Sequence, residues 1–471
     1  GGPLSRRRWL RRVAGTGALA AIPSSLLGRG ARGEVRIARF SADVTVPIGH
    51  GMMGGAWLSK SVADPLEAHG ILLIAGDRRI VWVTVDWCEI RNQAYERWQG
   101  ALARAAGTLP ENVLISTVHQ HDAPVADLEA ERILQARGLA GTLCDPVFHE
   151  EALGRVVAAL RFSLREARPV THIGTGEAVV ERVASNRRYV MPDGQIRFDR
   201  TSSTRNAFAI EAPEGLIDPR LKTLSFWNRD QPLAALSFYA VHPMSYYGQG
   251  EVSADFPGIA RRRRQAEARG VLQIYCSGCS GNVTAGKYNT GARENRPILA
   301  ARLHAAMAEA WKRTTRHPVT TLDYRAEPLI LEPRPEAAFS TEGLERRLIH
   351  ATPPFQQCLA AMGLSWRRRV EDGRPLQIPV IDFGPALLTL LPGESYVEFQ
   401  LAAQAMRPDA FVCVAGYGDG ATGYIPTARH LEEHDTNLGD WCWVGPGAED
   451  RLLTALRHAL QAKTPPPPAR V

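Results

Sequence analysis

The order of apolar and polar positions along the chain predicts alternating strands and helices. Short apolar, β-branched runs typical of strands lie at 35–48, 70–75, 79–86, 113–117, 172–183, 221–227, 233–240, 272–276, 387–391 and 411–415. Amphipathic helical spacing appears at 92–106, 145–167, 294–313 and 450–462, with a further helix expected beyond residue 394. The stretch 333–374 carries helical patches around a charged turn.

This order of elements indicates an α/β fold. The strand 79–86, the helix 92–106 and the strand 113–117 form a β-α-β unit, which favours neighbouring parallel strands. The strands 221–227 and 233–240 flank a short polar turn and are expected to pair. The chain has no internal repeat and no dividing linker. We therefore predict one large catalytic domain over 34–462, with layered mixed β-sheets flanked by helices, followed by a Pro-rich tail over 463–471.

Residues 1–33 have the pattern of an export signal and leader. Arginines at 6–8 are followed by Trp9 and Leu10, and then by an apolar, small-residue run that ends at about Leu27. Such a run is too short to cross a bilayer comfortably. The paired arginines resemble the twin-arginine signal of bacteria. The prediction is an exported, periplasmic or extracellular protein without a later transmembrane segment; the alternative is a basic disordered leader.

Charge and cysteine content exclude some classes of protein. The net charge is +7, but aromatic and basic residues do not alternate, so nucleic-acid binding is not expected. The run Arg261–Arg264 stands at the start of a helical pattern and is interpreted as a solvated face. The seven cysteines cannot all pair with one another. Cys276 and Cys279 form a lone C-x-x-C, which leaves a disulfide and two buried thiols as alternatives but does not favour structural zinc.

Polar side chains follow several predicted strands at the point where each strand ends. His119 and His121 come after 113–117 and, being two residues apart in an extended segment, project from one face. The others are His242 after 233–240, the loop Gly278–Thr284 after 272–276, Glu394 after 387–391, and Tyr424 a little beyond 411–415. Because sites in α/β sheets form beyond the carboxyl ends of strands, we predict that these segments share one site.

Two histidines and a carboxylate are the usual protein ligands of a hydrolytic zinc, which keeps one position for water. Zinc would lower the pKa of that water and polarise a carbonyl oxygen. Each residue also has a structural alternative. His242 fits a buried, hydrogen-bonded histidine, Glu394 fits a cap of the following helix, and Tyr424 fits a core aromatic. Asp86 is either a hydrogen-bond partner of a metal-binding histidine or a strand-end carboxylate.

Six motifs in order resemble the neutral/alkaline ceramidase family, between about residue 36 and about residue 435. They are Phe40–Gly49 with Asp64–Leu66, His119–Pro124, Val241–Pro243 with Ser253–Asp255, Gly281–Thr284, Pro392–Glu394 and Tyr424–Thr427. The resemblance implies a large α/β catalytic domain. It also implies a Zn²⁺ ion held by His119, His242, Glu394 and Tyr424.

By the same resemblance, His121 would sit beside the metal and stabilise or protonate the reacting group, and Arg187 would lie near the substrate. The implied reaction is hydrolysis of an N-acyl amide bond, as in ceramide, giving a fatty acid and an amine. The implied partner is thus an acyl-amide or lipid substrate.

Two departures from the family pattern bear on the mechanism and the substrate. Thr284 stands where the family carries a serine, and its extra methyl group would crowd nucleophilic attack. Metal-activated water is therefore the favoured nucleophile, with Thr284 as a hydrogen-bonding residue of its loop. The chain also ends soon after the catalytic region, without the immunoglobulin-like C-terminal domain of the family. Binding to membrane lipid is therefore not implied, and the substrate can be a different amide or a soluble one instead of ceramide.

Two rival functions stay open at this point. One is a hydrolase that uses Thr284 as nucleophile with His121 and without a catalytic metal. The other is a non-catalytic exported binding protein on the same scaffold. The intact set of two histidines, a glutamate and a tyrosine argues against the second, because a binding protein has no need of an open metal site.

Overall fold

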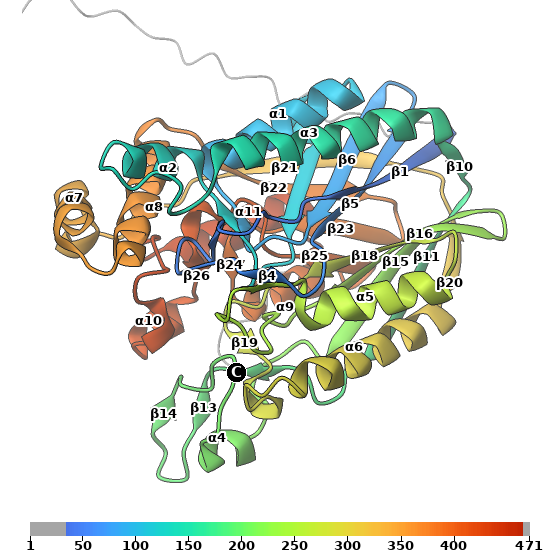
Figure 1. Ribbon diagram of the computed structural model, residues 1–471. Helices are drawn as coiled ribbons and strands as arrows, with labels where there is room; N and C mark the ends of the chain where they lie inside the picture. Colours follow the sequence, from blue (N-terminus) through green and yellow to red (C-terminus); the bar gives the residue numbers. More distant parts are fainter. Residues whose placement is uncertain (1–33, 465–471) are drawn as a thin grey trace, which may run out of the picture.

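Three β-sheets form the centre of the molecule, and helices cover their outer faces (Figure 1). The computed structural model describes residues 34–464. The predicted export signal over 1–33 and most of the Pro-rich tail lie outside the described residues. No helix of the described part is long and apolar enough to cross a membrane.

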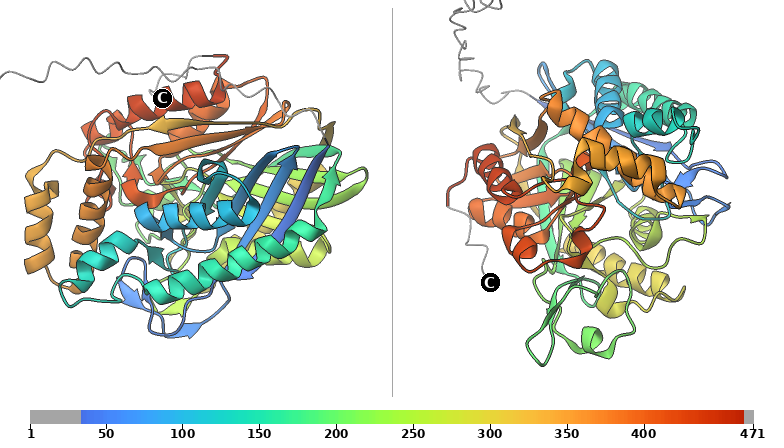
Figure 2. Two further views of the ribbon diagram at one scale, coloured as in Figure 1. Left: turned by 90° about the horizontal axis from the view of Figure 1, so that it is seen from above. Right: turned by 90° about the vertical axis from the view of Figure 1, so that its left-hand side faces the viewer.

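The first sheet contains the predicted β-α-β unit. Its strand order is β10 (Arg168–Val170), β1 (Val35–Asp43), β5 (Glu67–Ala75), β6 (Arg78–Val85) and β8 (Val113–Thr117). The helix α1 (Asn92–Ala106) joins β6 to β8, which pair in parallel as expected. A second helix, α3 (Pro146–Ser163), begins where Asp145 accepts a hydrogen bond from the Val147 amide. Both helices pack on this sheet (Figures 1 and 2).

The second sheet has the order β18 (Leu272–Ser277), β16 (Gln231–Tyr239), β15 (Arg220–Asn228), β11 (His172–Val179) and β20 (Thr315–Pro318). The predicted hairpin is β15 with β16, which pair antiparallel, and β16 pairs in parallel with β18. The helices α5 (Asp255–Glu267) and α6 (Asn295–Lys312) pack on the outer face of this sheet.

The third sheet has the order β21 (Asp323–Leu329), β22 (Leu376–Asp382), β23 (Ala386–Leu390) and β25 (Phe411–Ala415), and the last two strands are parallel. It is covered by α9 (Val397–Met406) and α11 (Ala448–Leu460). The segment between β21 and β22, for which the sequence indicated only helical patches, forms α7 (Thr341–His350) and α8 (Pro354–Glu371).

The segments that connect the three sheets contain short helices and strands. The helices are α2 (Leu128–Gln135), α4 (Ala207–Glu211) and α10 (Ala428–Glu432). The short strands are β2 (Gly51–Met52), β3 (Trp57–Leu58), β4 (Ser61–Val62), β7 (Glu89–Ile90), β9 (Val125–Ala126), β12 (Ser185–Asn186), β13 (Tyr189–Val190), β14 (Ile196–Arg197), β17 (Glu251–Val252), β19 (Val283–Thr284), β24 (Glu394–Ser395) and β26 (Tyr424–Ile425).

One apolar core is shared by all three sheets. Ile37 and Trp82 of the first sheet, Phe226 and Phe238 of the second and Leu388 of the third belong to a single cluster of buried side chains. The helices bury the opposite faces of the same strands in two further clusters. Strands buried on both faces read as nearly continuous apolar runs, which is why the sequence marks them clearly.

The interpretation of Arg261–Arg264 as a solvated face holds for Arg263, which is exposed, but is wrong for Arg261 and Arg264. The run lies in the second half of α5 rather than at a helix start, and Arg261 and Arg264 are only 3% and 7% exposed. Arg261 Nη2 lies 2.5 Å from Glu67 Oε2 of β5, an ion pair that ties α5 to the first sheet. All seven cysteines are free and buried, so Cys276 and Cys279 are two thiols rather than a disulfide.

A buried histidine makes the stability of the fold depend on pH. Trp98 Nε1 donates a hydrogen bond to His149 Nε2 at 3.0 Å, so this nitrogen has to be unprotonated. Burial lowers the pKa of His149 to about 4. Since the folded-state pKa lies below that of the unfolded chain, the stabilisation is complete above about pH 6.5 and is lost as the pH falls toward about 4.

We expect this residue alone to lower the free energy of unfolding by up to about 3 kcal/mol between pH 7 and pH 4. Urea unfolding followed by tryptophan fluorescence at several pH values measures the effect. His149→Gln keeps an acceptor for Trp98 without titrating, so its unfolding free energy should fall less steeply over this interval. Equal slopes for the variant and the wild type would contradict the assignment.

Candidate metal centre

The loops that follow three strands, one from each sheet, converge at one place. His119 follows β8 of the first sheet, His242 follows β16 of the second, and Glu394 follows β23 of the third. Their ligand atoms all lie within 4.8 Å of one another. Each side chain is almost fully buried, with exposures of 3%, 1% and 2%. The expectation that strand-end residues distant in sequence share a site is thus met by the positions of these three side chains.

The carboxylate of Glu394 stands between the two histidines. Its Oε2 atom is 3.2 Å from His119 Nε2 and 3.6 Å from His242 Nε2. The opposite nitrogen of each ring faces a carbonyl oxygen: His119 Nδ1 is 2.9 Å from Cys88 O, and His242 Nδ1 is 3.2 Å from Ser280 O. A carbonyl oxygen can only accept, so each Nδ1 carries a proton, and each Nε2 presents a lone pair when its ring is neutral.

Three lone-pair donors therefore point at one another, and Glu394 Oε2 has no hydrogen-bond partner. Such an arrangement is costly in a buried site unless a cation lies between the donors. Two imidazoles held by their Nδ1–H groups and one carboxylate are the ligand chemistry of zinc. Burial lowers the pKa of His119, but Cys88 and Glu394 outweigh burial and raise it well above the usual value. A proton there would take the place of the metal, and metal binding would release it.

His121 is the more accessible neighbour of this centre. Its Nε2 atom lies 3.3 Å from His242 Nε2, and its ring packs edge-on against Tyr247, with centroids 4.9 Å apart. Nδ1 of His121 is buried without a hydrogen-bond partner. Burial, together with His119 and Arg187, holds the pKa of His121 well below its usual value. A neutral imidazole beside the cluster can accept a proton or pass one on.

Tyr424 and Arg187 are also brought to this region. The strands β24 and β26 pair in parallel with Glu394 opposite Tyr424. Arg187 Nη1 donates a hydrogen bond to the Tyr424 hydroxyl at 2.8 Å, and Arg187 is 4% exposed. Burial raises the pKa of Tyr424, and the guanidinium opposes that effect. A buried positive charge beside this hydroxyl is suited to stabilising negative charge on an oxygen.

Two glycines of the motifs permit the close packing of these loops. A Cβ atom on Gly281 would lie 2.2 Å from the carbonyl oxygen of Glu394. Gly393 has a φ of +52°, and a Cβ atom there would lie 2.0 Å from Thr422 Oγ1. Side chains at either position would push the loops apart, so the glycines hold Glu394 where it meets the histidines.

Thr284 is held by backbone groups. Its hydroxyl donates to Thr201 O at 2.6 Å and accepts from the Gly286 amide at 3.2 Å, and the residue is fully buried. It lies in β19, opposite Ser185 of β12. Among the described residues, the hydrogen-bond partners of its hydroxyl are these backbone groups and Arg200 O, not a member of the histidine cluster.

Several residues at the centre were not anticipated from the sequence. The ring of Tyr417 stacks on His119. Glu89 Oε1 lies 4.0 Å from His119 Nδ1, and Arg91 pairs with Glu89. Tyr417 lies two residues after β25, and a polar residue near a strand end is the one sequence feature that points to it. Glu89 begins the short strand β7 and Arg91 follows that strand, and no sequence feature connects either residue to the cluster.

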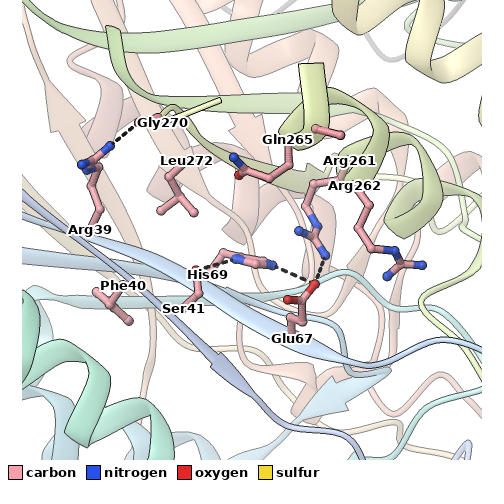
Figure 3. A pocket seen from close by; sticks show the side chains of 11 residues that line it. Arg39, Phe40, Ser41, Glu67, His69, Arg261, Arg262, Gln265, Gly270 and Leu272 are labelled. Atoms are coloured by element: carbon pink, nitrogen blue, oxygen red, sulfur yellow. Dashed lines mark hydrogen bonds and ion pairs between the residues drawn. The ribbon is translucent and has the colours of Figure 1, made fainter. Parts of the chain in front are cut away.

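Asp86 is not a partner of the cluster histidines. It directly follows the first-sheet strand β6, accepts a hydrogen bond from the Glu67 amide at 3.0 Å, and lies in a second group of ligand-type residues with Glu67 and His69. Figure 3 shows Glu67 and His69 of this group in a cavity of about 650 Å³ between the first sheet and α5. Arg261 Nη2 stands 2.5 Å from Glu67 Oε2 and 3.6 Å from Asp86 Oδ2. The guanidinium of Arg261 thus lies where a cation would bind between Glu67 and Asp86. In the described part of the chain, no such positively charged side chain lies between the donors at Glu394.

Comparisons with known proteins bear on the fold. No protein-family model and no curated protein matches the chain. Among solved structures, neutral ceramidase from Pseudomonas aeruginosa is similar over 92% of this chain and 75% of its own, with 18% identity and a TM-score of 0.64. A ceramidase complexed with C2 is similar over 93% of this chain and 77% of its own, with 17% identity and a TM-score of 0.64. The predicted α/β architecture and the resemblance to ceramidases are confirmed at the level of the fold: this chain has the fold of neutral ceramidase.

Proposed function

We propose that this protein is a zinc-dependent hydrolase that cleaves an N-acyl amide bond, in ceramide or a related acyl amide, to a fatty acid and an amine. The observation that carries the proposal is the convergence of His119 Nε2, His242 Nε2 and Glu394 Oε2, a buried oxygen without a hydrogen-bond partner. The nitrogen and oxygen donors favour zinc among the divalent metals of hydrolases. Tyr424, opposite Glu394, is the proposed fourth ligand.

Zinc held by these residues would supply Lewis acidity toward the amide carbonyl and an activated water nucleophile. The chain itself supplies the rest. His121, neutral and adjacent to His242, would take a proton from the attacking water and deliver it to the leaving amine at Nε2. Arg187 and the Tyr424 hydroxyl would hold the carbonyl oxygen as negative charge develops on it.

The substrate class rests on two supports. The motif order resembles that of ceramidases, and the chain shares its fold with two proteins named as ceramidases. We further propose that the catalytic unit spans 34–462 and that the leader pattern directs the protein out of the cytoplasm. An exported enzyme of this kind would meet acyl amides supplied from outside the cell or from its envelope.

Metal content and turnover test this function together. Elemental mass spectrometry of the purified protein should find about one zinc per chain. A panel of acyl amides that varies the acyl length and the amine should then show hydrolysis that a chelator abolishes and added zinc restores. Folded protein that takes up no zinc would refute the metal mechanism. Zinc-loaded protein that binds an amide without turnover would favour the non-catalytic binding function.

Thr284→Val discriminates the metal mechanism from attack by a threonine hydroxyl. The change removes a buried donor and leaves the Thr201 carbonyl unpaired, so we expect a loss of about 1–3 kcal/mol in unfolding free energy. In the folded enzyme kcat should stay within about tenfold of the wild type, since one lost hydrogen bond beside the site perturbs geometry by that order. A fall of about 10⁴-fold or more, with zinc still bound and with Thr284→Ser active, would instead assign the hydroxyl as nucleophile.

A further inference from the structure

We infer that Tyr417 is the residue that positions both histidine ligands of the proposed zinc centre. The inference rests on the proposed function and assigns a role to a side chain for which the motifs predict none. Tyr417 lies two residues beyond β25 and is 1% exposed. It contacts His119 through its ring and His242 through its hydroxyl, so a single side chain touches both imidazoles.

The ring contact controls the plane of His119. The two rings are stacked with centroids 4.2 Å apart and an interplanar angle of 18°. Among the described residues, the hydrogen bonds of the His119 ring are made at Nδ1, with Cys88 O and Cys88 Sγ. A hydrogen bond at one nitrogen still allows the imidazole to tilt about that bond. The stacked phenol ring removes this freedom and keeps Nε2 directed at Glu394.

The hydroxyl contact controls the tautomer of His242, that is, which ring nitrogen carries the proton. The Tyr417 hydroxyl lies 2.7 Å from Ser280 Oγ and 3.3 Å from His242 Nδ1. When it donates to the serine, its oxygen is left to accept from Nδ1–H. Together with Ser280 O, this second acceptor favours the tautomer that leaves Nε2 of His242 free to bind metal.

The backbone of Tyr417 joins two ligand-bearing loops. Its carbonyl accepts from the Thr117 amide at 2.9 Å, two residues before His119, and its amide donates to Gly393 O at 3.1 Å, directly before Glu394. The residue has a φ of +57° and His119 has a φ of +68°. Left-handed backbone at two non-glycine residues in contact costs free energy and persists where the surrounding structure imposes it, which is typical of functional sites.

The test is zinc affinity, measured by competition with a chromophoric chelator. Mutation of a residue that orients a metal ligand lowers the affinity for the metal by about 10–100-fold. We expect Tyr417→Phe, which keeps the ring and loses the hydroxyl, to weaken zinc binding by about tenfold, and Tyr417→Leu, which loses both, by about 100-fold. Tyr275→Phe is the matched control, because Tyr275 is a buried tyrosine whose hydroxyl faces Tyr239 O rather than a histidine.

A second measurement separates positioning from general stability. The ¹⁵N chemical shifts of the histidine rings report tautomer, and in zinc-free Tyr417→Phe the His242 signal should shift toward the Nε2-protonated form while urea unfolding stays close to that of Tyr275→Phe. Wild-type protein that binds zinc, with both Tyr417 variants binding it equally well, would overturn this inference and leave the proposed function intact. Wild-type protein that binds no zinc would overturn the proposed function and this inference with it.

Discussion

Replacing His119 should remove zinc and lower kcat/KM for an acyl amide by at least about 10³-fold, since a catalytic metal supplies several kcal/mol of transition-state stabilisation. His119 Nε2 is the nitrogen closest to Glu394 Oε2, at 3.2 Å against 3.6 Å for His242. Without it, one imidazole and one carboxylate remain of the three converging donors. With Tyr424 as the only further proposed ligand, that set should lose its zinc to a chelator.

The choice of substitution matters because the backbone of His119 is left-handed, with a φ of +68°. Alanine at such a position adds backbone strain, whereas asparagine adopts it more readily and its amide is a poor zinc ligand. His119→Asn should therefore lose metal while unfolding at nearly the wild-type urea concentration, and His119→Ala should lose metal and some stability. His149→Gln is the matched control, a buried histidine outside the groups of possible metal ligands, and should keep its zinc. Retention of one zinc by His119→Asn would show that the centre is elsewhere.

Arg91→Ala should destabilise the protein by about 3–5 kcal/mol, the cost of leaving buried charge uncompensated. Arg91 is fully buried. Its guanidinium lies 2.7 Å from Glu89 and 3.4 Å from Asp127, and it donates to Ala421 O at 3.0 Å. Removing it leaves two buried carboxylates, Glu89 and Asp127, without their cation. Chemical unfolding in urea measures the loss.

Arg97→Ala is the matched control on the same helix. Arg97 pairs with Glu150 at 2.6 Å, a shorter contact than either ion pair of Arg91, but both side chains are about half exposed, at 42% and 45%. Solvent screening limits such a pair to less than about 1 kcal/mol. An equal loss of unfolding free energy in the two variants would mean that burial does not determine how much the Arg91 contacts stabilise the protein.

The Arg91 cluster also borders the metal centre. Glu89 joins the two, because one of its oxygens binds Arg91 and the other lies 4.0 Å from His119 Nδ1 without a hydrogen-bond partner of its own. Arg91→Ala should thus weaken zinc binding in the fraction that stays folded, because a freed Glu89 carboxylate would compete with Cys88 O for the Nδ1–H of His119 and turn the ring away from Glu394.

The sequence by itself determined the local elements and the places where chemistry would appear. The helices α1, α3, α6 and α11 begin and end within a few residues of the predicted bounds, because amphipathic spacing and capping residues act over one or two turns. The strands β8, β16, β23 and β25 were predicted because strands buried on both faces need nearly continuous apolar runs. Three of the polar residues that follow such runs, His119, His242 and Glu394, lie together in the structure.

The tertiary structure alone decided which residues surround the cluster. That three sheets each contribute one ligand depends on packing between strands more than a hundred residues apart, which no local pattern encodes. The same holds for Tyr417 against His119, for Arg91 against Asp127, and for Arg261 against Glu67. An arginine run has the same pattern whether it faces water or a buried carboxylate. Only the position of the partner decides between the two, because a charge is stable in the interior when an opposite charge lies within a few ångströms.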